Sequence, residues 1–230
     1  MTYLLRGALV EYASDFLGPL PNVVVFQFNP ETLTRVIQIP PRPTGATARE
    51  TSQAGEIPVE RITLKAQFSA AQTLGDGDVV SRGIARTVGV GPQLAALEQM
   101  VHPTNVLGKL IGQAIDAVGK ALGLGSGGSG KAPEQPIPRE QYPRILFIWG
   151  LTRVLPVIIE SMSITEQQYD ALLNPVEAEV TIGLAVVDIS ACSDDEVAKG
   201  AQEYTAAAQE SLAVSNLLVA APLVRDLIPF

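Results

Sequence analysis

The chain has few of the side chains from which catalytic and metal sites are usually built. It contains one histidine, one cysteine and one tryptophan in 230 residues. With Cys192 as the sole cysteine, a disulfide within the chain is excluded, and synthesis in a reducing compartment is favoured. Zinc sites need several His or Cys ligands, and a catalytic nucleophile needs a nearby base. His102 and Cys192 lie far apart in sequence, so we expect neither a nucleophile–base pair of these two residues nor a metal or cofactor site.

Charge is also scarce. Charged residues make up 17% of the chain, against about 25% in typical soluble domains, which hints at surface buried against partners. The net charge of -8 argues against nucleic acid as a partner. No apolar run reaches the roughly 18 residues of a membrane span. Arg6 and Glu11 interrupt the first apolar residues, so we expect no secretory signal and synthesis in the cytoplasm.

Alternating apolar and polar residues predict a mainly β fold with some helix. We expect two antiparallel sheets that close as a sandwich or partial barrel. The clearest strand is 176–186, where every second residue is apolar, and with 154–166 it predicts a long hairpin across 154–188. The other expected strands are 3–12, 22–28, 33–39, 59–69 and 145–149.

Helical spacing of apolar residues predicts helices at 92–101 and 104–123. A third helix is predicted at 194–219, opened by a capping box from Ser193 to Glu196 and ended by Pro222. Leu74–Asp78 is predicted to be a turn, and a calcium site there is the weaker interpretation because the full ligand loop is missing. Residues 40–58 are expected to form an extended loop.

These elements divide the chain into four parts. Residues 1–102 and 139–190 are predicted to be the two halves of one β domain. Between them, 103–138 is expected to be a helical insertion followed by a flexible Gly/Ser/Pro linker. Residues 191–230 form the expected C-terminal helix and tail.

The glycine-rich tract Gly123–Lys131 matches two phosphate-binding patterns by letter. Such loops need a strand before them and a helix after them. Here an expected helix precedes the tract and prolines follow it, which favours a linker. A nucleotide-binding enzyme that uses this tract remains an alternative from another functional class.

Glu177 and Glu179 stand two apart on the same face of the predicted strand 176–186. They could form a carboxylate pair, but exposed acids on a half-buried strand explain them equally well. If that strand lines a tube, they would give its lumen negative charge.

The most specific motif is FQFNPETLTR at residues 26–35. Alternation places Val24, Phe26 and Phe28 on one strand face. Proline then ends the strand, and Asn29 can cap a short helical turn that starts at Pro30. The residues that we expect to anchor this motif are Phe26, Phe28, Asn29, Pro30, Leu33 and Arg35.

The motif resembles the N-terminal signature of tube-type proteins from contractile injection systems, which are phage-tail-like particles. The stretch from Ser161 to Leu184 is similar to the C-terminal half of the same tail-tube fold. Within that family the resemblance is to tube initiators of the baseplate hub. Many members of the family carry a carbohydrate-binding LysM module, which we do not expect any part of this sequence to form. The resemblance implies a structural protein without enzymatic activity, located in a phage-tail-like particle.

The expected partners follow from the same resemblance. They are copies of this chain in a hexameric ring, the inner-tube protein, the spike or hub protein and other baseplate proteins. A tail-tube or baseplate protein of an ordinary contractile phage is the nearest alternative. The residues expected to build the tube wall are Ile158, Met162, Ile164, Tyr169, Asn174, Pro175, Val180, Ile182 and Leu184.

Overall fold

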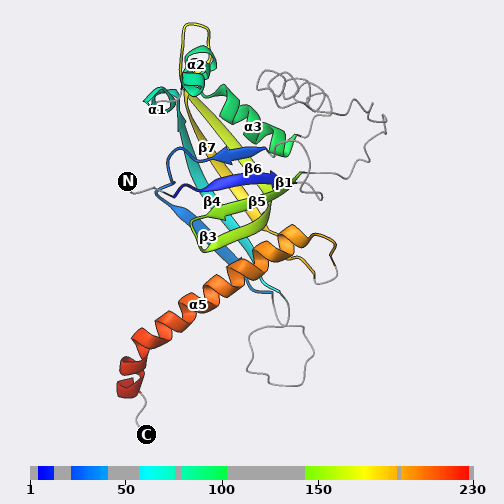
Figure 1. Cartoon of the computed structure of the whole chain (residues 1–230), viewed down its shortest axis with the longest axis vertical. Coiled ribbons are helices and arrows are strands. Elements are labelled where there is room, and N and C mark those ends of the chain that lie inside the picture. The colour runs from blue at the N-terminus through cyan, green and yellow to red at the C-terminus, as the bar shows by residue number, and fades with distance from the viewer. Residues whose placement is uncertain are drawn as a thin grey trace.

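The computed structural model in Figure 1 describes residues 5–12, 22–40, 57–75, 79–102, 143–190 and 193–227, with side chains to 221. The expected insertion and linker at 103–138 lie outside the described residues, as do Cys192 and Asp76–Asp78. Most of the expected loop 40–58 also lies outside them.

The described strands form one antiparallel sheet of seven strands, in the order β2-β1-β5-β6-β7-β4-β3. The mainly β fold is confirmed, but the described residues form a single sheet where two were expected. The reason is that strands from both halves of the chain interleave, because β1 pairs with β5 and β4 pairs with β7. The strands are β1 (Ala8–Tyr12), β2 (Val23–Val25), β3 (Leu33–Gln38), β4 (Val59–Ser69), β5 (Arg144–Trp149), β6 (Arg153–Tyr169) and β7 (Pro175–Val186).

Four helices are described: α1 (Ala70–Gly75), α2 (Val79–Val88), α3 (Gly91–Val101) and α5 (Glu196–Leu227). The prediction of a helix at 92–101 is confirmed by α3. The helices α1 and α2 were not expected. In particular, Leu74 and Gly75 belong to α1, where the sequence favoured a turn.

The core lies on one face of β4 and β7. On β7, Ala178, Val180, Ile182 and Leu184 are buried, and their polar neighbours face outward. Ile62, Leu64, Ala66 and Phe68 of β4 are buried in the same alternating way. Each fully buried Leu, Ile or Phe stabilises the fold by about 1.5–3 kcal/mol relative to exposure. These two strands therefore account for much of the packing.

The ends of α5 differ from the expectation. Asp195, not Ser193, caps the helix, because its Oδ1 accepts from the amide of Ala198 at 3.0 Å. Ser193 Oγ accepts instead from the amide of Asp195, so the capping-box prediction is wrong by two residues. The helix also continues past Pro222 to Leu227. That proline removes one amide donor, and the carbonyl it would have served belongs to the exposed Leu218.

The sheet is curled. Its two edge strands, β2 and β3, are consecutive in sequence. The stretch 23–38 begins paired with β1 and ends paired with β4, near opposite ends of the sheet order. One short stretch can do this only if the two ends of the sheet approach each other, and Figure 1 shows the strands wrapping in this way.

Candidate assembly site

Residues 26–29, which we call the closing segment, hold the beginning of β1 on one side. The amide of Phe26 donates to the Gly7 carbonyl at 2.9 Å. Asn29 accepts from the Gly7 amide at 3.1 Å and donates to the Leu5 carbonyl at 2.8 Å. A Cβ at Gly7 would lie 2.6 Å from the Trp149 ring, so only glycine permits this approach without a shift.

The closing segment holds β4 and α1 on its other side. The Oε1 atom of Gln27 accepts from the Ser69 amide at 2.6 Å, and its Nε2 donates to Thr73 Oγ1 at 2.9 Å. Phe28 forms an isolated antiparallel bridge with Gln67. The closing segment therefore joins the two ends of the curled sheet. Gln27 is a functional candidate that sequence reasoning missed, although it lies inside the motif.

The remaining motif residues take different positions. Phe26 is fully buried, and Leu33 packs half-buried against the core. Phe28 is 41% exposed whereas Phe26 is fully buried, so the expectation that the two share one strand face is wrong. The cause is its bridge to Gln67, whose position on β4 faces outward.

The helical turn expected after Asn29 is also absent. Residues 29–32 form no helix in the structure. The Asn29 side chain bonds to the backbone just before β1 instead of capping a helical turn. Pro30 is half-buried. Arg35 lies on β3, where its Nε donates to Glu60 Oε1 at 2.5 Å. This ion pair is the main reason that the pKa of Arg35 is raised.

The predicted long hairpin is formed by β6 and β7. Val180, Ile182 and Leu184 are buried, while Met162 and Ile164 are half-buried against the core. Ile158 is 57% exposed, although it shares the parity of Met162. A β-bulge between Ile159 and Ser161 explains this, because one extra residue reverses which side chains face inward.

The tip of the hairpin is held by a polar turn. Asp170 accepts from the amides of Leu172 and Asn174 at 2.7 and 2.8 Å. Asn174 Nδ2 also donates to Asp170 Oδ2 at 2.9 Å. That side-chain bond first, and then the backbone bonds, lower the pKa of Asp170. Tyr169 is exposed beside the turn, and Leu172 and Leu173 project from it at 77% and 78% exposure.

The helical side of the molecule supports this tip. Asn174 Nδ2 donates to the Thr87 carbonyl at 3.0 Å, and the amide of Val90 donates to the Pro175 carbonyl at 2.9 Å. Gly89 stands at this contact with a φ of +61°, and a Cβ there would lie 2.1 Å from the Pro175 oxygen. Glycine is therefore required at the joint between α2 and α3.

The outward face of β4, β7 and β6 is polar and carries both small hydroxyl side chains and charged ones. Lys65 Nζ contacts Glu179 Oε1 at 2.8 Å across the strands. Glu179 thus has a cation as partner, which does not favour the carboxylate pair with Glu177. A shallow hollow of about 250 Å³ lies on this face. Its lining residues are Phe28, Gln67, Phe68, Ser69, Gln167, Glu177, Ala178 and Glu179.

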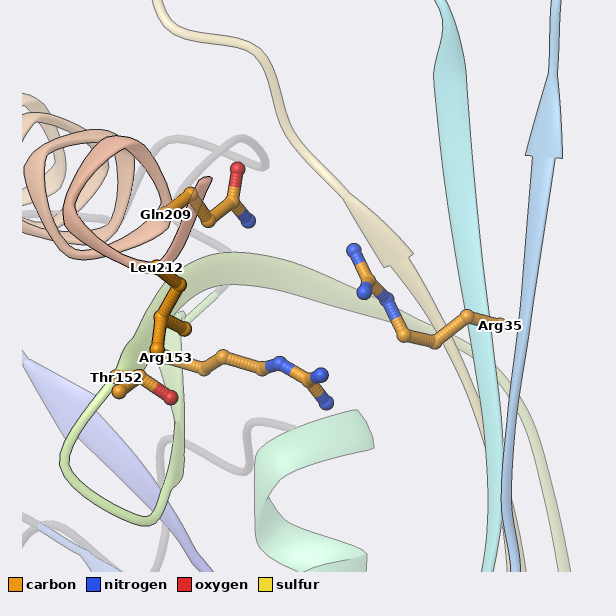
Figure 2. A pocket seen from close by; sticks show the side chains of 5 residues that line it. All are labelled: Arg35, Thr152, Arg153, Gln209 and Leu212. Atoms are coloured by element: carbon orange, nitrogen blue, oxygen red, sulfur yellow. The ribbon is translucent and has the colours of Figure 1, made fainter. Parts of the chain in front are cut away.

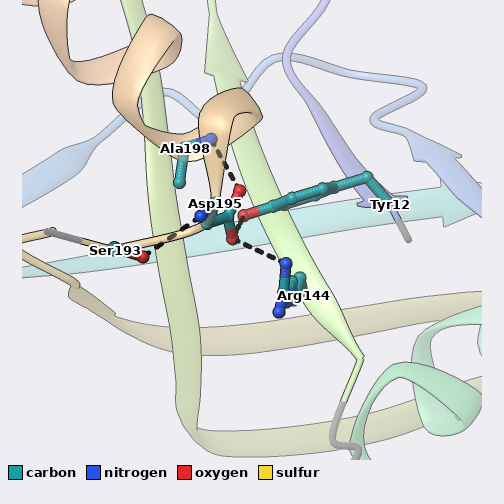
Figure 3. A network of polar contacts seen from close by, with 5 residues as sticks. All are labelled: Tyr12, Arg144, Ser193, Asp195 and Ala198. Carbon is teal, nitrogen blue, oxygen red and sulfur yellow. Dashed lines mark hydrogen bonds and ion pairs between the residues drawn. The ribbon is translucent and has the colours of Figure 1, made fainter. Parts of the chain in front are cut away.

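The start of α5 is fixed to the sheet by Asp195. Figure 3 shows Tyr12 from β1 and Arg144 from β5 converging on this carboxylate. The Tyr12 hydroxyl donates to Oδ2 at 2.9 Å, and Arg144 Nη1 lies 3.2 Å from the same atom. Burial is the main reason that the pKa of Tyr12 is raised, and the hydrogen bond to Asp195 raises it further. The phenol therefore stays protonated and donates.

The described residues contain neither a metal-binding cluster nor a membrane-spanning helix. Within the described residues no group of three or more His, Cys, Asp or Glu side chains gathers to hold a metal ion. His102 ends α3, where its amide donates to the Glu98 carbonyl at 2.8 Å. None of the described helices is long and apolar enough to cross a membrane.

Comparison with known proteins adds no assignment. No protein-family model matches the chain, and no curated protein matches it significantly.

Proposed function

We propose that this chain is a structural subunit of a contractile injection system. In this proposal, copies form a hexameric ring that joins the spike or baseplate hub to the inner tube and templates tube assembly. The observation that carries the proposal is the role of the signature motif. Its residues Phe26, Gln27 and Asn29 use their polar and apolar groups to close the sheet, which is what a wall-forming subunit requires.

The curled sheet supports a tail-tube-like partial barrel. Its longest strands, β6 and β7, pair from Val157 to Tyr169 and extend beyond the rest of the sheet toward the tip. We propose that this hairpin contributes the tube wall and that its tip contacts a neighbouring layer. Leu172 and Leu173, which project there, would be covered by that contact.

The polar outward face of β4, β7 and β6 suits the lumen of such a tube. A wall that lets a passenger slide past should offer weak, evenly spread polar contacts instead of apolar ones. Ser161, Ser163 and Thr165 of β6 face outward beside Thr181 of β7. The Lys65–Glu179 ion pair leaves little net charge at its position.

Exposed apolar side chains support assembly with partners. Large exposed apolar patches on soluble proteins usually mark interaction sites. Val36, Ile37, Ile39, Ile57 and Val59 are exposed on both faces of the sheet, on or beside β3 and β4. Another group lies on the second half of α5 and consists of Leu212, Val214, Leu217, Leu218 and Val219. A ring built from head-to-tail contacts uses two different patches on each copy.

The proposed role is mechanical and requires no catalytic residue or cofactor. Its partners would be copies of the chain, the inner-tube protein, the hub protein and other baseplate proteins. The finished ring would belong to the phage-tail-like particle.

Native mass spectrometry and negative-stain electron microscopy test this function. The full chain is measured alone and mixed with a candidate inner-tube protein of a contractile injection system. We expect annular particles with the mass of six copies, and short tube layers growing from them when tube protein is present. A chain that stays monomeric in every mixture contradicts the proposal.

Variants in the closing segment sharpen this test. Gln27→Ala and Asn29→Ala remove the side-chain bonds that join the ends of the sheet, so they should reduce ring formation strongly. Glu31→Ala changes an exposed residue of the same motif and should leave assembly unchanged. Equal effects of all three variants would show that the motif acts through its surface and not through closure.

A further inference from the structure

A second hollow, of about 210 Å³, lies where α5 crosses the end of the sheet. Its lining residues are Arg35, Thr152, Arg153, Gln209 and Leu212. Figure 2 shows the Arg35 and Arg153 side chains extending toward each other, with the Gln209 amide above them. Two arginines and no carboxylate thus line this hollow in a chain whose net charge is -8.

Arg153 has no counter-ion among the described residues. It begins β6 and is half-buried, and within the described residues its side chain makes no ion pair or hydrogen bond. A partly buried guanidinium that lacks an acceptor has given up hydration without compensation. The position therefore favours a ligand that accepts hydrogen bonds and carries negative charge.

Arg35 is only partly satisfied. Its Nε atom is engaged by Glu60, and its side chain is 27% exposed. The terminal nitrogen atoms face the hollow (Figure 2). Because Glu60 balances the charge of Arg35, the hollow as a whole retains about the charge of Arg153.

The other residues that line the hollow fit a ligand that accepts hydrogen bonds and has an apolar part. The Gln209 amide and the Thr152 hydroxyl can each donate one hydrogen bond. Leu212 supplies an apolar side. A guanidinium fork recognises planar, two-oxygen groups best, and this geometry matches a carboxylate on a short aliphatic chain.

We propose that the hollow between Arg35, Arg153 and Gln209 is a carboxylate-binding site. The carboxylate can come from an acidic side chain of a second copy or from a small free dicarboxylate. The first source rests on the proposed ring, whereas the second does not. In both cases the ligand would connect β3 and β6 of the sheet to α5.

Binding of glutarate to the full chain tests the site directly. Backbone NMR shifts are followed while glutarate is added at constant ionic strength. We expect saturable shifts at Thr152, Arg153 and Gln209. Arg153→Gln should weaken binding about tenfold, since a charged hydrogen-bonded pair is lost. Arg86→Gln, which removes the same charge from the exposed surface of α2, should leave the affinity unchanged.

A variant that supplies the carboxylate within the chain provides a second test. Gln209→Glu should place an acid opposite Arg153, raise the unfolding midpoint and abolish glutarate binding. Ala207→Glu adds the same charge at an exposed position of the same helix that does not line the hollow. It should neither raise the midpoint nor block glutarate.

Assembly measurements separate the two sources. If a neighbouring copy provides the acid, Arg153→Gln and excess glutarate should both dissociate rings, and Arg86→Gln should not. If free dicarboxylate is the ligand, glutarate binds in an Arg153-dependent manner and rings are unaffected. The site is disproved if glutarate does not bind and Arg153→Gln leaves assembly unchanged. When no ring forms at all, the proposed function fails, and the glutarate titration alone decides the site.

Discussion

The two halves of α5 behave in opposite ways. In the first half the residues that pack on the sheet are small, and Ala198, Ala201 and Thr205 are buried. In the second half the residues are large and apolar, yet Leu217 and Leu218 are 65% and 76% exposed. From Ser211 to Val224 the sequence contains no charged residue. Figure 1 shows α5 extending well past the sheet.

Packing against the sheet and apolar content are therefore separate properties of α5. The first half of α5 packs closely on the sheet and forms specific hydrogen bonds to it. Its small side chains permit both. The second half has apolar side chains on several of its sides, a pattern typical of a helix buried by neighbours on several sides. We infer that the first half serves the fold of one subunit and the second half serves assembly.

Removing Asp195 should have the largest effect on the first half. Asp195→Ala eliminates the helix cap and the bond from Tyr12 and leaves Arg144 without its acid. We expect a loss of about 3 kcal/mol in the free energy of unfolding, measured by urea denaturation. Asp194→Ala removes the same charge from an exposed neighbour and should change stability by less than about 0.5 kcal/mol. A comparable loss in both variants would contradict the assignment of Asp195 as the anchor.

Removing the hydrogen bonds of Thr205 should destabilise the attachment of the first half of α5 by a smaller amount. Its Oγ1 accepts from the Val154 amide at 2.9 Å and donates to the Val154 carbonyl at 2.7 Å. Thr205→Val keeps the shape but leaves both backbone groups without this partner, at a cost of about 1–3 kcal/mol. Thr205→Ser keeps the hydroxyl and should retain most of the stability. Urea denaturation of the two Thr205 variants shows whether the hydrogen bonds or the packing of this side chain stabilise the fold.

High pH should weaken the same anchor. The pKa of Tyr12 is raised in the folded state, so its contribution is complete below the unfolded value of about 10. It is lost progressively as pH rises above that value. The wild type should therefore lose more stability than Tyr12→Phe between about pH 9 and 11. Thermal unfolding at several pH values measures this, and parallel curves would contradict it.

The second half of α5 should tolerate substitution in the isolated subunit. Leu217→Gln and Leu218→Gln remove exposed apolar groups, so the free energy of unfolding should change by less than about 0.5 kcal/mol. The same variants should reduce ring formation in native mass spectra. A large loss of subunit stability would show that this half packs on its own chain.

Local patterns in the sequence predicted local structure well. The alternation in 176–186 identified β7 and its buried residues, and helical spacing identified α3. The polar residue Gln27 was missed because its partners, Ser69 and Thr73, are distant in sequence, and no local pattern reports them. The bulge at Ile159 likewise reversed the side-chain alternation between Ile158 and Met162, and either parity was compatible with the sequence.

The N-cap of α5 could not be predicted from the local sequence either. Ser193, Asp194 and Asp195 are all good N-cap residues, so propensity alone cannot choose between them. Tyr12 and Arg144 decide the matter, since both bind Asp195 from other strands. The single sheet was not predicted for a related reason: which strands become neighbours depends on pairings between distant segments.

The pairing of β4 with β7 has a consequence for biosynthesis. Arg61 lies opposite Ala185, so β4 leaves the ribosome long before its partner has been translated. During that interval the β3–β4 hairpin presents an unsatisfied backbone edge next to the apolar side chains of Ile62 and Leu64. Such nascent edges attract other chains. Newly made chains would therefore benefit from a chaperone, or from slow expression at low temperature, until β7 has been translated.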